Sequence, residues 1–397
     1  MSDLARPTGL AGLSALHVSL QAEARDVAVL FSSRAREIRQ HQLDHGEMHP
    51  ELWAAFCEHR WPGLVIPPEY GGTEGGLVGM VLVLEAFAEQ GIVLWMPVLS
   101  CAIAHAIAEV GPGAARQEWC SKVARGEALL AMATTEPHCG HNLFRTATEV
   151  RREADCFVVN GVKRVTSGLD VADRVLVFGR DPAGGDGGSD SYTTVLIDPR
   201  AAGAVMTQLP MRREGVRQYQ LALRDVVVPV GDLVGAQGQG LATMWPFTHV
   251  ERILTAGLGL GLATFALTRS IARAKQRVIF GELPIGANQA ISHPLAHLHA
   301  RLAAIRLFVY HTATRFDTGV DAFVVAGEAN MAKVLASDLA FDACDQAIQT
   351  LGADAWDERE GLLEVYLDAR LYRSGPVSNE LALNFIAKHV LGLPAHT

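Results

Sequence analysis

The feature that most limits the fold of this 397-residue sequence is a strand-like stretch set between two helical regions. From about residue 129 to residue 232, β-rich runs alternate with turn residues and show no helical period. Residues 13–40 carry apolar positions at helical spacing, and the same spacing returns after Gly240. The pattern predicts an α, then β, then α architecture.

The boundaries of this pattern predict three domains. A chain of this length exceeds the size at which a single hydrophobic core keeps growing, so we expect packed subdomains. We predict an N-terminal helical domain over residues 1–128, a central antiparallel β domain over 129–238 and a C-terminal four-helix bundle over 239–397. The further helices predicted in the flanking domains are 51–60, 77–90, 97–109, 114–125, 241–276, 289–318, 321–350 and 378–391.

Within the central domain, Asn160-Gly161 is the strongest short-range signal. These residues stand between two β-rich runs, and both favour the positive φ of a two-residue hairpin turn. The sequence therefore predicts a hairpin here, in an antiparallel sheet or small barrel. Further strands are predicted at 174–178, 192–197 and 219–228, with a glycine-rich hairpin loop over 181–191.

Charge and composition argue against several classes of protein. The formal net charge is −9 and no dense run of Lys and Arg offsets it, so nucleic-acid binding is not expected. Only 19% of the residues are charged, which suits a chain that also buries surface against other subunits. The six cysteines are scattered without CxxC spacing and indicate reduced thiols in the cytoplasm.

No targeting or membrane segment is predicted. The N-terminal residues lack a basic start followed by an unbroken apolar core, so the pattern of a secretory signal is absent. The longest apolar runs, such as residues 258–267, are interrupted by Gly and Thr and fall short of the roughly 20 residues that cross a bilayer. We therefore expect no membrane span and a cytoplasmic location.

Two groups of histidines have spacings that could present two imidazoles on one helix face. Neither group has the H-E-x-x-H wording of a zinc site, and Gly46, Pro50 and Pro294 interrupt them. We predict no metal site. The two groups are His41, His45 and His49, and His293, His297 and His299.

Five short motifs follow one another along the chain. They are Pro67-Pro-Glu-Tyr-Gly-Gly72, Thr135-Glu-Pro-His-Cys-Gly140, Asn160-Gly-Val-Lys163, Arg277-Val-Ile-Phe-Gly281 and Gln349-Thr-Leu-Gly352. In wording and order they resemble motifs of the acyl-CoA dehydrogenase family. The resemblance spans nearly the whole chain. It implies a flavoprotein that binds FAD and has a helical domain, a central β domain and a C-terminal four-helix bundle.

The resemblance implies which residues hold the flavin ring. Thr135 matches a family Thr that lies beside the ring, in the motif that Gly140 closes, and a hydroxyl held by a following Pro is a rigid donor. Thr166 and Ser167 resemble the family's second flavin strand and would place a hydroxyl near the flavin N5. The alternative for Thr135 is a capped turn ahead of a strand.

Two departures from the family pattern affect this site. The segment after Lys163 is one residue shorter than usual and has no Trp, which the family uses as an aromatic contact to the flavin. His141-Asn142 stands where the family has Ser-Asp. His141 is therefore either a contact to the pyrophosphate of FAD or a simple loop histidine.

A further set of residues matches the positions at which the family's bundle binds the adenosine diphosphate half of the FAD of a neighbouring subunit. A guanidinium suits paired phosphates, and a glycine permits close approach of the backbone. The alternative for the arginine is a solvated side chain at a helix end. The resemblance thus implies a homo-oligomer, either a dimer or a tetramer. The residues are Arg277, Phe280, Gln289, Gln349 and Gly352.

The chemistry of the family needs one carboxylate as base on the face opposite the flavin. Most members carry it in a loop before the last helix, where this sequence has Pro376. A smaller branch, including isovaleryl-CoA and long-chain dehydrogenases, carries a Glu on the first bundle helix before an Arg, as in Glu251-Arg252. We predict Glu251 as the base, with His249 and Arg252 near the acyl-CoA. The alternative is a partnered surface pair at a helix start.

The predicted reaction is the α,β-dehydrogenation of an acyl thioester to the 2-enoyl thioester. Glu251 would take the α-proton while a hydride passes to flavin N5, and an electron-transferring flavoprotein would reoxidise the flavin. The substrate is either an acyl-CoA or the acyl thioester of an acyl-carrier protein, and the identity of the acyl group is not predicted. Two alternatives are a flavin monooxygenase or oxidase on the same fold, and a non-catalytic subunit of a heteromeric dehydrogenase.

Overall fold

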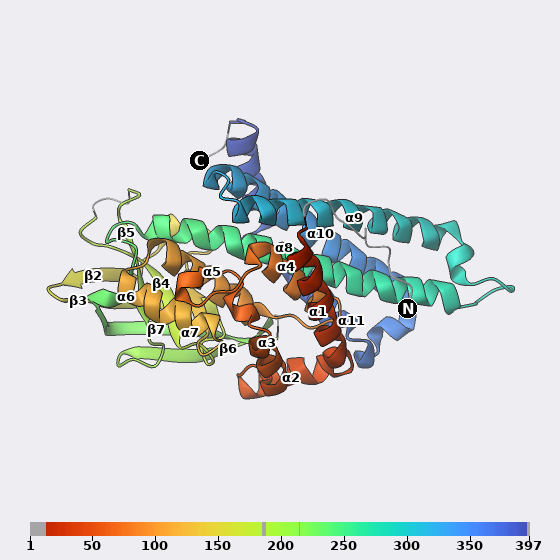
Figure 1. Ribbon diagram of the computed structural model, residues 1–397, viewed down its shortest axis with the longest axis horizontal. Coiled ribbons are helices and arrows are strands. Elements are labelled where there is room, and N and C mark those ends of the chain that lie inside the picture. Colours follow the sequence, from red (N-terminus) through yellow and green to blue (C-terminus); the bar gives the residue numbers. More distant parts are fainter. Residues whose placement is uncertain (1–12, 185–187, 214, 395–397) are drawn as a thin grey trace. The chain divides into compact units, whose positions relative to one another are not determined.

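The structure is a computed structural model that describes residues 13–184, 188–213 and 215–394 (Figure 1). The chain forms two compact units, each built from segments distant in the sequence. The first, here called the helical unit, comprises Met1–Glu37, Leu77–Leu94 and Arg252–Thr397. The second, here called the sheet unit, comprises Ile38–Gly76 and Trp95–Glu251. The order of helices, strands and helices along the chain confirms the predicted fold class.

Long helices dominate the helical unit. Helices α8 (Gly240–Gln276, which begins in the sheet unit), α9 (Gln289–Asp317) and α10 (Ala322–Leu351) agree with prediction to within one or two residues. α9 and α10 run alongside one another in Figure 1. The other helices that lie mainly in this unit are α1 (Ala15–Phe31), α4 (Gly76–Ala88), α11 (Leu362–Tyr372) and α12 (Asn379–Phe385).

The C-terminal region differs from prediction in two places. The helix predicted at 378–391 is α12 followed by a π-helical turn, Ile386–Val390. Helix α11 was not predicted. It is short and begins after Gly361, whose φ is 64°, directly behind the 3₁₀ turns Gly352–Trp356 and Glu358–Glu360, so the start signals of an ordinary helix are absent.

Helix α4 is buried on all sides from Leu77 to Ala88, as expected of a helix that is apolar all round. Glycines on α8 let the two helices approach closely. A Cβ on Gly257 would lie 3.1 Å from Val81 Cγ1, and one on Gly261 would lie 2.4 Å from Ala88 Cβ. The absence of a side chain at Gly261 therefore sets the spacing between α4 and α8.

We expect the substitution Gly261→Ala to lower the free energy of unfolding by about 1–3 kcal/mol, because the added methyl group must displace α4. Thermal unfolding at a fixed excess of FAD measures this loss. Gly113→Ala is the matched control, since Gly113 also lies in a helix and a Cβ there meets nothing within 4 Å. Equal melting temperatures for the two variants would contradict the close packing of α4 and α8.

A buried polar network joins α4, α8 and α9. Arg306 Nε donates to Glu85 Oε1 at 2.7 Å, and its Nη2 donates to Thr264 Oγ1 at 2.8 Å. The Tyr310 hydroxyl donates to the other oxygen of Glu85, and Glu89 Oε1 lies 3.9 Å from Arg306. Burial, reinforced by the negative Glu85, raises the pKa of Tyr310 well above its ordinary value. Tyr310 therefore acts as a neutral donor.

Helix α8 corrects the expectation that no segment is long and apolar enough to cross a membrane. By length and composition this helix qualifies, because the short runs judged separately in the sequence join into one helix. However, 89% of its most apolar stretch is buried inside the structure. A mostly buried apolar helix is typical of the core of a soluble fold.

Among its described residues, the sheet unit has eight strands, with the order β6-β7-β3-β2-β4-β5-β8 and β1 beside β4. Most neighbours are antiparallel, but β1 and β2 each pair with β4 in parallel, so the sheet is mixed rather than wholly antiparallel. The strands are β1 (Leu130–Ala133), β2 (Glu149–Glu153), β3 (Cys156–Ser167), β4 (Arg174–Arg180), β5 (Tyr192–Ile197), β6 (Ala204–Arg213), β7 (Val216–Pro229) and β8 (Leu233–Val234).

Short helices complete the sheet unit. Most lie before β1, in the region where the sequence predicts helices. They are α2 (Ala35–His45, which begins in the helical unit), α3 (Pro50–Glu58), α5 (Trp95–Val110), α6 (Gly113–Ala115) and α7 (Ser121–Ala124), with 3₁₀ turns at Trp61–Gly63 and Pro68–Tyr70.

The hairpin predicted at Asn160-Gly161 is wrong. β3 continues through both residues, and the chain reverses earlier, at Ala154-Asp155 between β2 and β3. Asn160 Nδ2 donates to Asp225 Oδ1 at 2.9 Å across the strands, and the register of β3 against β7 shifts at this point. The Asn-Gly pair therefore forms a β-bulge, because the conformations that suit a hairpin turn also suit a bulge.

The glycine-rich loop predicted over 181–191 is described only in part, because residues 185–187 lie outside the described residues. Its two ends are joined: Asp181 N donates to Ser191 O at 2.8 Å. The loop connects β4 to β5, which are antiparallel neighbours, as the prediction of a hairpin requires.

Candidate functional site

The segment after β1 carries the first predicted flavin residue, Thr135. A short bridge shapes the loop that follows, in which Glu136 N donates to Cys139 O at 2.8 Å and Cys139 N donates back at 3.2 Å. Thr135 itself is half-buried, and its carbonyl oxygen accepts from Arg164 N at 2.8 Å. Thr135 is thereby attached to strand β3, which carries the second predicted flavin residue.

A buried ion pair lies between this loop and β3. Lys163 Nζ, whose side chain is 0% exposed, donates to Glu136 Oε1 at 2.7 Å and to Thr134 O at 3.1 Å. Glu136 also accepts from Thr146 Oγ1 and from Ala147 N at 2.7 Å. Neither Glu136 nor Lys163 was predicted to have a role. Their presence in two of the five motifs was the signal that could have identified them.

The charge state of Glu136 follows from these contacts. Burial by itself raises the pKa of this carboxyl group, but the positive Lys163 and the hydrogen bonds from Thr146 and Ala147 outweigh burial and lower the pKa to about 2. The carboxyl group is therefore ionised at neutral pH. The stability that it contributes is present above its ordinary pKa of 4.5 and is lost as the pH falls towards 2.

Beyond Lys163 the backbone of β3 adopts an uncommon conformation. Val165 has a φ of 59°, in the left-handed region that β-branched residues rarely adopt, and the register against β7 shifts between Lys163 and Thr166. This irregularity directs the side chains that follow. Ser167 Oγ donates to Gln218 Oε1 at 3.1 Å, whereas the Thr166 hydroxyl is buried and meets no hydrogen-bond partner in the described part of the chain.

The buried hydroxyl of Thr166 bears on whether this segment can bind a flavin. A buried hydroxyl without a partner is costly, so native proteins usually pair such groups. A bound group with donors and acceptors along its edge would satisfy it, as the pyrimidine edge of a flavin does. Gly140 and His141 lie exposed on the loop after Thr135, where they are accessible to an anionic group. These residues therefore fit the predicted cofactor.

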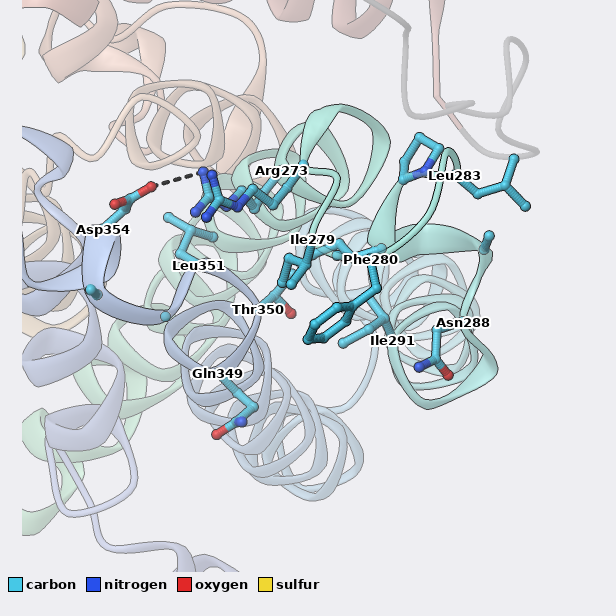
Figure 2. Close-up of a pocket in the computed structure, with 16 residues that line it drawn as sticks. Arg273, Ile279, Phe280, Leu283, Asn288, Ile291, Gln349, Thr350, Leu351 and Asp354 are labelled. Carbon is cyan, nitrogen blue, oxygen red and sulfur yellow. Dashed lines mark ion pairs between the residues drawn. The ribbon is translucent and has the colours of Figure 1, made fainter.

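A second candidate region is a pocket of about 730 Å³ in the helical unit, at the turn between α8 and α9 and the end of α10 (Figure 2). It gathers four of the five residues predicted to bind adenosine diphosphate: Arg277, Phe280, Gln349 and Gly352. The fifth, Gln289, is exposed at the start of α9 and does not line the pocket, whereas its neighbour Asn288 does.

The charges in this pocket are unevenly balanced. Arg273 Nη1 and Asp354 Oδ2 form an ion pair at 2.8 Å, drawn as a dashed line in Figure 2. The guanidinium of Arg277 makes no ion pair with any of the described residues. Phe280 is 90% exposed beside it and offers an aromatic face. An uncompensated guanidinium and an aromatic ring suit a nucleotide diphosphate.

We expect Arg277→Gln to weaken FAD binding by about 10- to 100-fold, the range that the loss of one charge-assisted hydrogen bond produces. The dissociation constant is measured by titrating the apoprotein with FAD. Lys275→Gln is the matched control, because Lys275 lies at the same helix end and is exposed but does not line the pocket. Equal affinities for both variants would show that Arg277 does not hold the cofactor.

The predicted base, Glu251, lies on α8 and is half-buried. Near it, Trp245 and His249 form an edge-to-face contact with ring centroids 4.9 Å apart, and His249 is buried. His249 and Arg252 are three residues apart, so they share one side of the helix, and Glu251 lies about 100° around the axis from Arg252. Arg252 is also half-buried.

The alternative position for the base carries no carboxylate. The loop from Ser374 to Ser378 contains only Gly375, Pro376 and Val377 between its ends. The fully buried Lys333 holds this loop by donating to Val377 O. This segment therefore has no side chain that could take the α-proton as a carboxylate does. Glu380 is the next acidic residue along the chain, and it is exposed in the first turn of α12.

Three of the histidines with the spacing of metal ligands lie close together. The rings of His41 and His45 lie 4.6 Å apart and those of His41 and His49 lie 5.0 Å apart, measured between centroids. His41 Nε2 lies 3.2 Å from Glu47 Oε1. Nevertheless, no group of three His, Cys, Asp or Glu residues that could hold a metal ion is found in the described ranges.

Comparison with protein-family models matches both helical regions. The model described as acyl-CoA dehydrogenase, N-terminal domain, matches residues 15–127. The model described as acyl-CoA dehydrogenase, C-terminal domain, matches residues 238–391. Together the two matches cover more than half of the chain.

Curated relatives extend along most of the chain. Acyl-CoA dehydrogenase FadE12 of Mycobacterium tuberculosis is 35% identical over 360 residues, which are 89% of this chain and 92% of that protein. The caffeyl-CoA reductase-Etf complex subunit CarC of Acetobacterium woodii is 25% identical over 341 residues, or 85% of this chain and 88% of that protein.

Solved structures show the same fold. Butyryl-CoA dehydrogenase from Megasphaera elsdenii superposes with a TM-score of 0.87 and 24% identity, covering 96% of this chain and 99% of that one. The FAD complex of PigA superposes with a TM-score of 0.86 and 21% identity, over 96% and 99% of the two chains.

Proposed function

Because this chain belongs to the acyl-CoA dehydrogenase family, we propose that it dehydrogenates an acyl thioester to the 2-enoyl thioester, with Glu251 as the base. It is an oxidoreductase, and its cofactor is FAD. The substrate is an acyl-CoA or the acyl thioester of an acyl-carrier protein. The bound FAD supplies the acceptor for the β-hydrogen, which leaves as hydride to N5.

One observation supports the assignment of the base. Among the two places where the family carries its carboxylate, this chain has Glu251 on α8 and Pro376 in the loop before the last helix. Proline cannot accept a proton, so Glu251 is the remaining matched carboxylate. Its position on a rigid helix suits a base that must be held within reach of one carbon atom of the substrate.

The residues of this chain have distinct parts in the proposed reaction. Glu251 takes the proton from the α-carbon, and Arg252 and His249 contact the acyl-CoA. Partial burial of Glu251 excludes part of the surrounding water, which strengthens its interaction with the substrate. No residue of this chain needs to donate a proton, because the reaction removes a proton from the α-carbon and the bound FAD would accept the β-hydrogen as a hydride.

Two sets of residues would hold the FAD. Thr135, Thr166 and Ser167, with Gly140 and His141 in the adjoining loop, would contact the flavin ring and pyrophosphate. The set in the helical unit would bind the adenosine diphosphate half of the FAD of a neighbouring subunit, so the active form is a homo-oligomer, a dimer or a tetramer. That set is Arg277, Phe280, Gln289, Gln349 and Gly352.

Reoxidation requires a redox partner. We propose an electron-transferring flavoprotein, and the relative CarC is named as a subunit of a complex with Etf. Retention of Glu251 weighs against a flavin monooxygenase or oxidase of the kind that lacks the base and activates oxygen, because no α-proton is removed in such a reaction. It equally weighs against a non-catalytic subunit.

The test uses the purified protein with FAD bound. Acyl-CoA thioesters of straight and branched chains, and acyl-carrier-protein thioesters, are added under anaerobic conditions. At least one is expected to bleach the visible flavin absorption and to yield an enoyl product identified by mass spectrometry. Failure of every thioester to bleach a fully loaded protein would overturn the proposed function, and rapid oxygen consumption with an external reductant would favour the oxidase.

A further inference from the structure

Two charged residues lie at the predicted flavin segments without contacting any group that the proposed reaction uses. Glu136 follows Thr135 in the loop after β1, and Lys163 lies three residues before Thr166 on β3. Both side chains are buried, at 5% exposure for Glu136 and 0% for Lys163. A buried ion pair rarely adds to stability compared with apolar residues of the same volume, so its presence calls for another explanation.

The contacts of this pair converge on the Thr135 segment. Lys163 Nζ donates to Thr134 O at 3.1 Å, and the next residue, Arg164, donates its backbone N–H to Thr135 O at 2.8 Å. Two consecutive carbonyl groups are thus held by two consecutive residues of β3. The backbone of Thr135 is fixed relative to β3 by these bonds.

On the other side of Lys163 the same strand carries the strained residue and the unsatisfied hydroxyl. Val165 has a φ of 59°, and Thr166 Oγ1 follows it without a partner in the described chain. A left-handed conformation is strained for a β-branched residue such as valine, and it persists only where the surrounding structure fixes it. Lys163, whose ammonium group makes three hydrogen bonds, lies two residues before Val165.

The carboxylate of Glu136 is anchored as firmly as the ammonium group of Lys163. Glu136 accepts from Ala147 N at 2.7 Å, from Thr148 N at 3.0 Å and from Thr146 Oγ1. These donors precede β2, which pairs with β3. The carboxylate therefore ties the loop to the strands on both sides, and neither charged group is able to move without breaking several bonds.

We propose that Glu136 and Lys163 are positioning residues that together hold the Thr135 and Thr166 hydroxyls at the flavin edge. This inference rests on the proposed contacts of Thr135 and Thr166 with the flavin. The pair acts through the backbone. Lys163 holds the carbonyl group of Thr134, the residue before Thr135, and it lies two residues before Val165, whose left-handed conformation precedes Thr166.

The test compares variants of the holoenzyme by three readouts that need no acyl substrate. These are the dissociation constant of FAD, the visible absorption and circular dichroism of the bound flavin, and the melting temperature. The double variant Glu136→Gln/Lys163→Met removes both charges, so no unpaired buried charge remains. We expect about tenfold weaker FAD binding, the effect of losing one well-placed hydrogen bond, together with an altered flavin spectrum.

Two comparisons separate positioning from stability. The single variant Lys163→Met leaves Glu136 unpaired, so its melting temperature should fall further than that of the double variant, while both share the altered spectrum. The control Glu85→Gln/Arg306→Met removes the buried pair of the helical unit; it should lower the melting temperature and leave the flavin spectrum unchanged. Spectral changes that merely track melting temperature across the set would overturn the inference.

The inference can also be distinguished from its premise. Thr135→Val and Thr166→Val each remove one hydroxyl with little change in shape. If neither alters FAD affinity or the flavin spectrum, the proposed flavin contacts are wrong and the inference fails with them. If both do, and the double variant Glu136→Gln/Lys163→Met is folded with an unchanged spectrum and affinity, the inference alone is overturned.

Discussion

The substitution Glu251→Gln is expected to slow flavin reduction by an acyl thioester by about 10²- to 10⁴-fold, the range found when a general base is removed. Gln has nearly the same shape as Glu but cannot accept the α-proton. FAD should remain bound, because Glu251 is not among the residues that would hold it. Anaerobic stopped-flow bleaching, at saturating thioester, measures the rate of this single step.

Glu380→Gln is the matched control for that experiment. Glu380 is the acidic residue next in sequence to the loop in which most of the family carries its base, and it is exposed in the first turn of α12. Its loss should leave the reduction rate within about twofold of the parent, since surface substitutions of this kind have small effects. An unchanged rate of flavin reduction in Glu251→Gln, or a loss of that rate in Glu380→Gln, would show that the base is not on α8.

The second large effect is expected from Arg306→Met, which should lower the free energy of unfolding by about 3–5 kcal/mol. This substitution leaves the buried carboxylate of Glu85 without the guanidinium that lies 2.7 Å from it. Glu89, 3.9 Å from Arg306, loses the same cation. Thermal or urea unfolding at a fixed excess of FAD reports the change.

Arg301→Met on the same helix provides the comparison. Arg301 pairs with Asp342 at 2.7 Å, but both side chains are at least 32% exposed. A surface pair of this kind contributes about 0–1 kcal/mol, so the melting temperature should change little. Similar losses in the two variants would mean that the burial of the Glu85 pair has no energetic importance.

The resemblance of the motifs predicted the residues of the candidate site, and the structure brings part of them together. Four of the five residues predicted for the adenosine diphosphate half line one pocket. The fifth, Gln289, does not line it, but the preceding residue, Asn288, does. Thr135 and Thr166 lie on two segments joined by a backbone hydrogen bond from Arg164. Glu136 and Lys163 were missed because their importance comes from meeting one another, and they are 27 residues apart in the sequence.

The order of helices and strands was predicted from local pattern, because hydrophobic period reflects how a segment exposes one side to the core. The Asn160-Gly161 prediction failed for a reason of the same kind. The local preference for positive φ is real, since Gly161 has a φ of 156°, but a bulge and a turn both satisfy it. Only the partner strand, β7, decides between them by supplying Asp225 to Asn160.

By itself, the sequence determined the succession of helical, strand and helical regions and the motif residues, and it led to the prediction that Glu251 replaces the carboxylate missing at Pro376. These depend on residue identity and on spacing within one segment. Tertiary structure decided which buried charges are paired, where β3 bends at Val165, and that the Thr166 hydroxyl stays buried without a partner in the described chain. Those outcomes depend on contacts between segments that are distant in the sequence. Such contacts produce no periodic pattern within a single segment, so the sequence alone does not predict them.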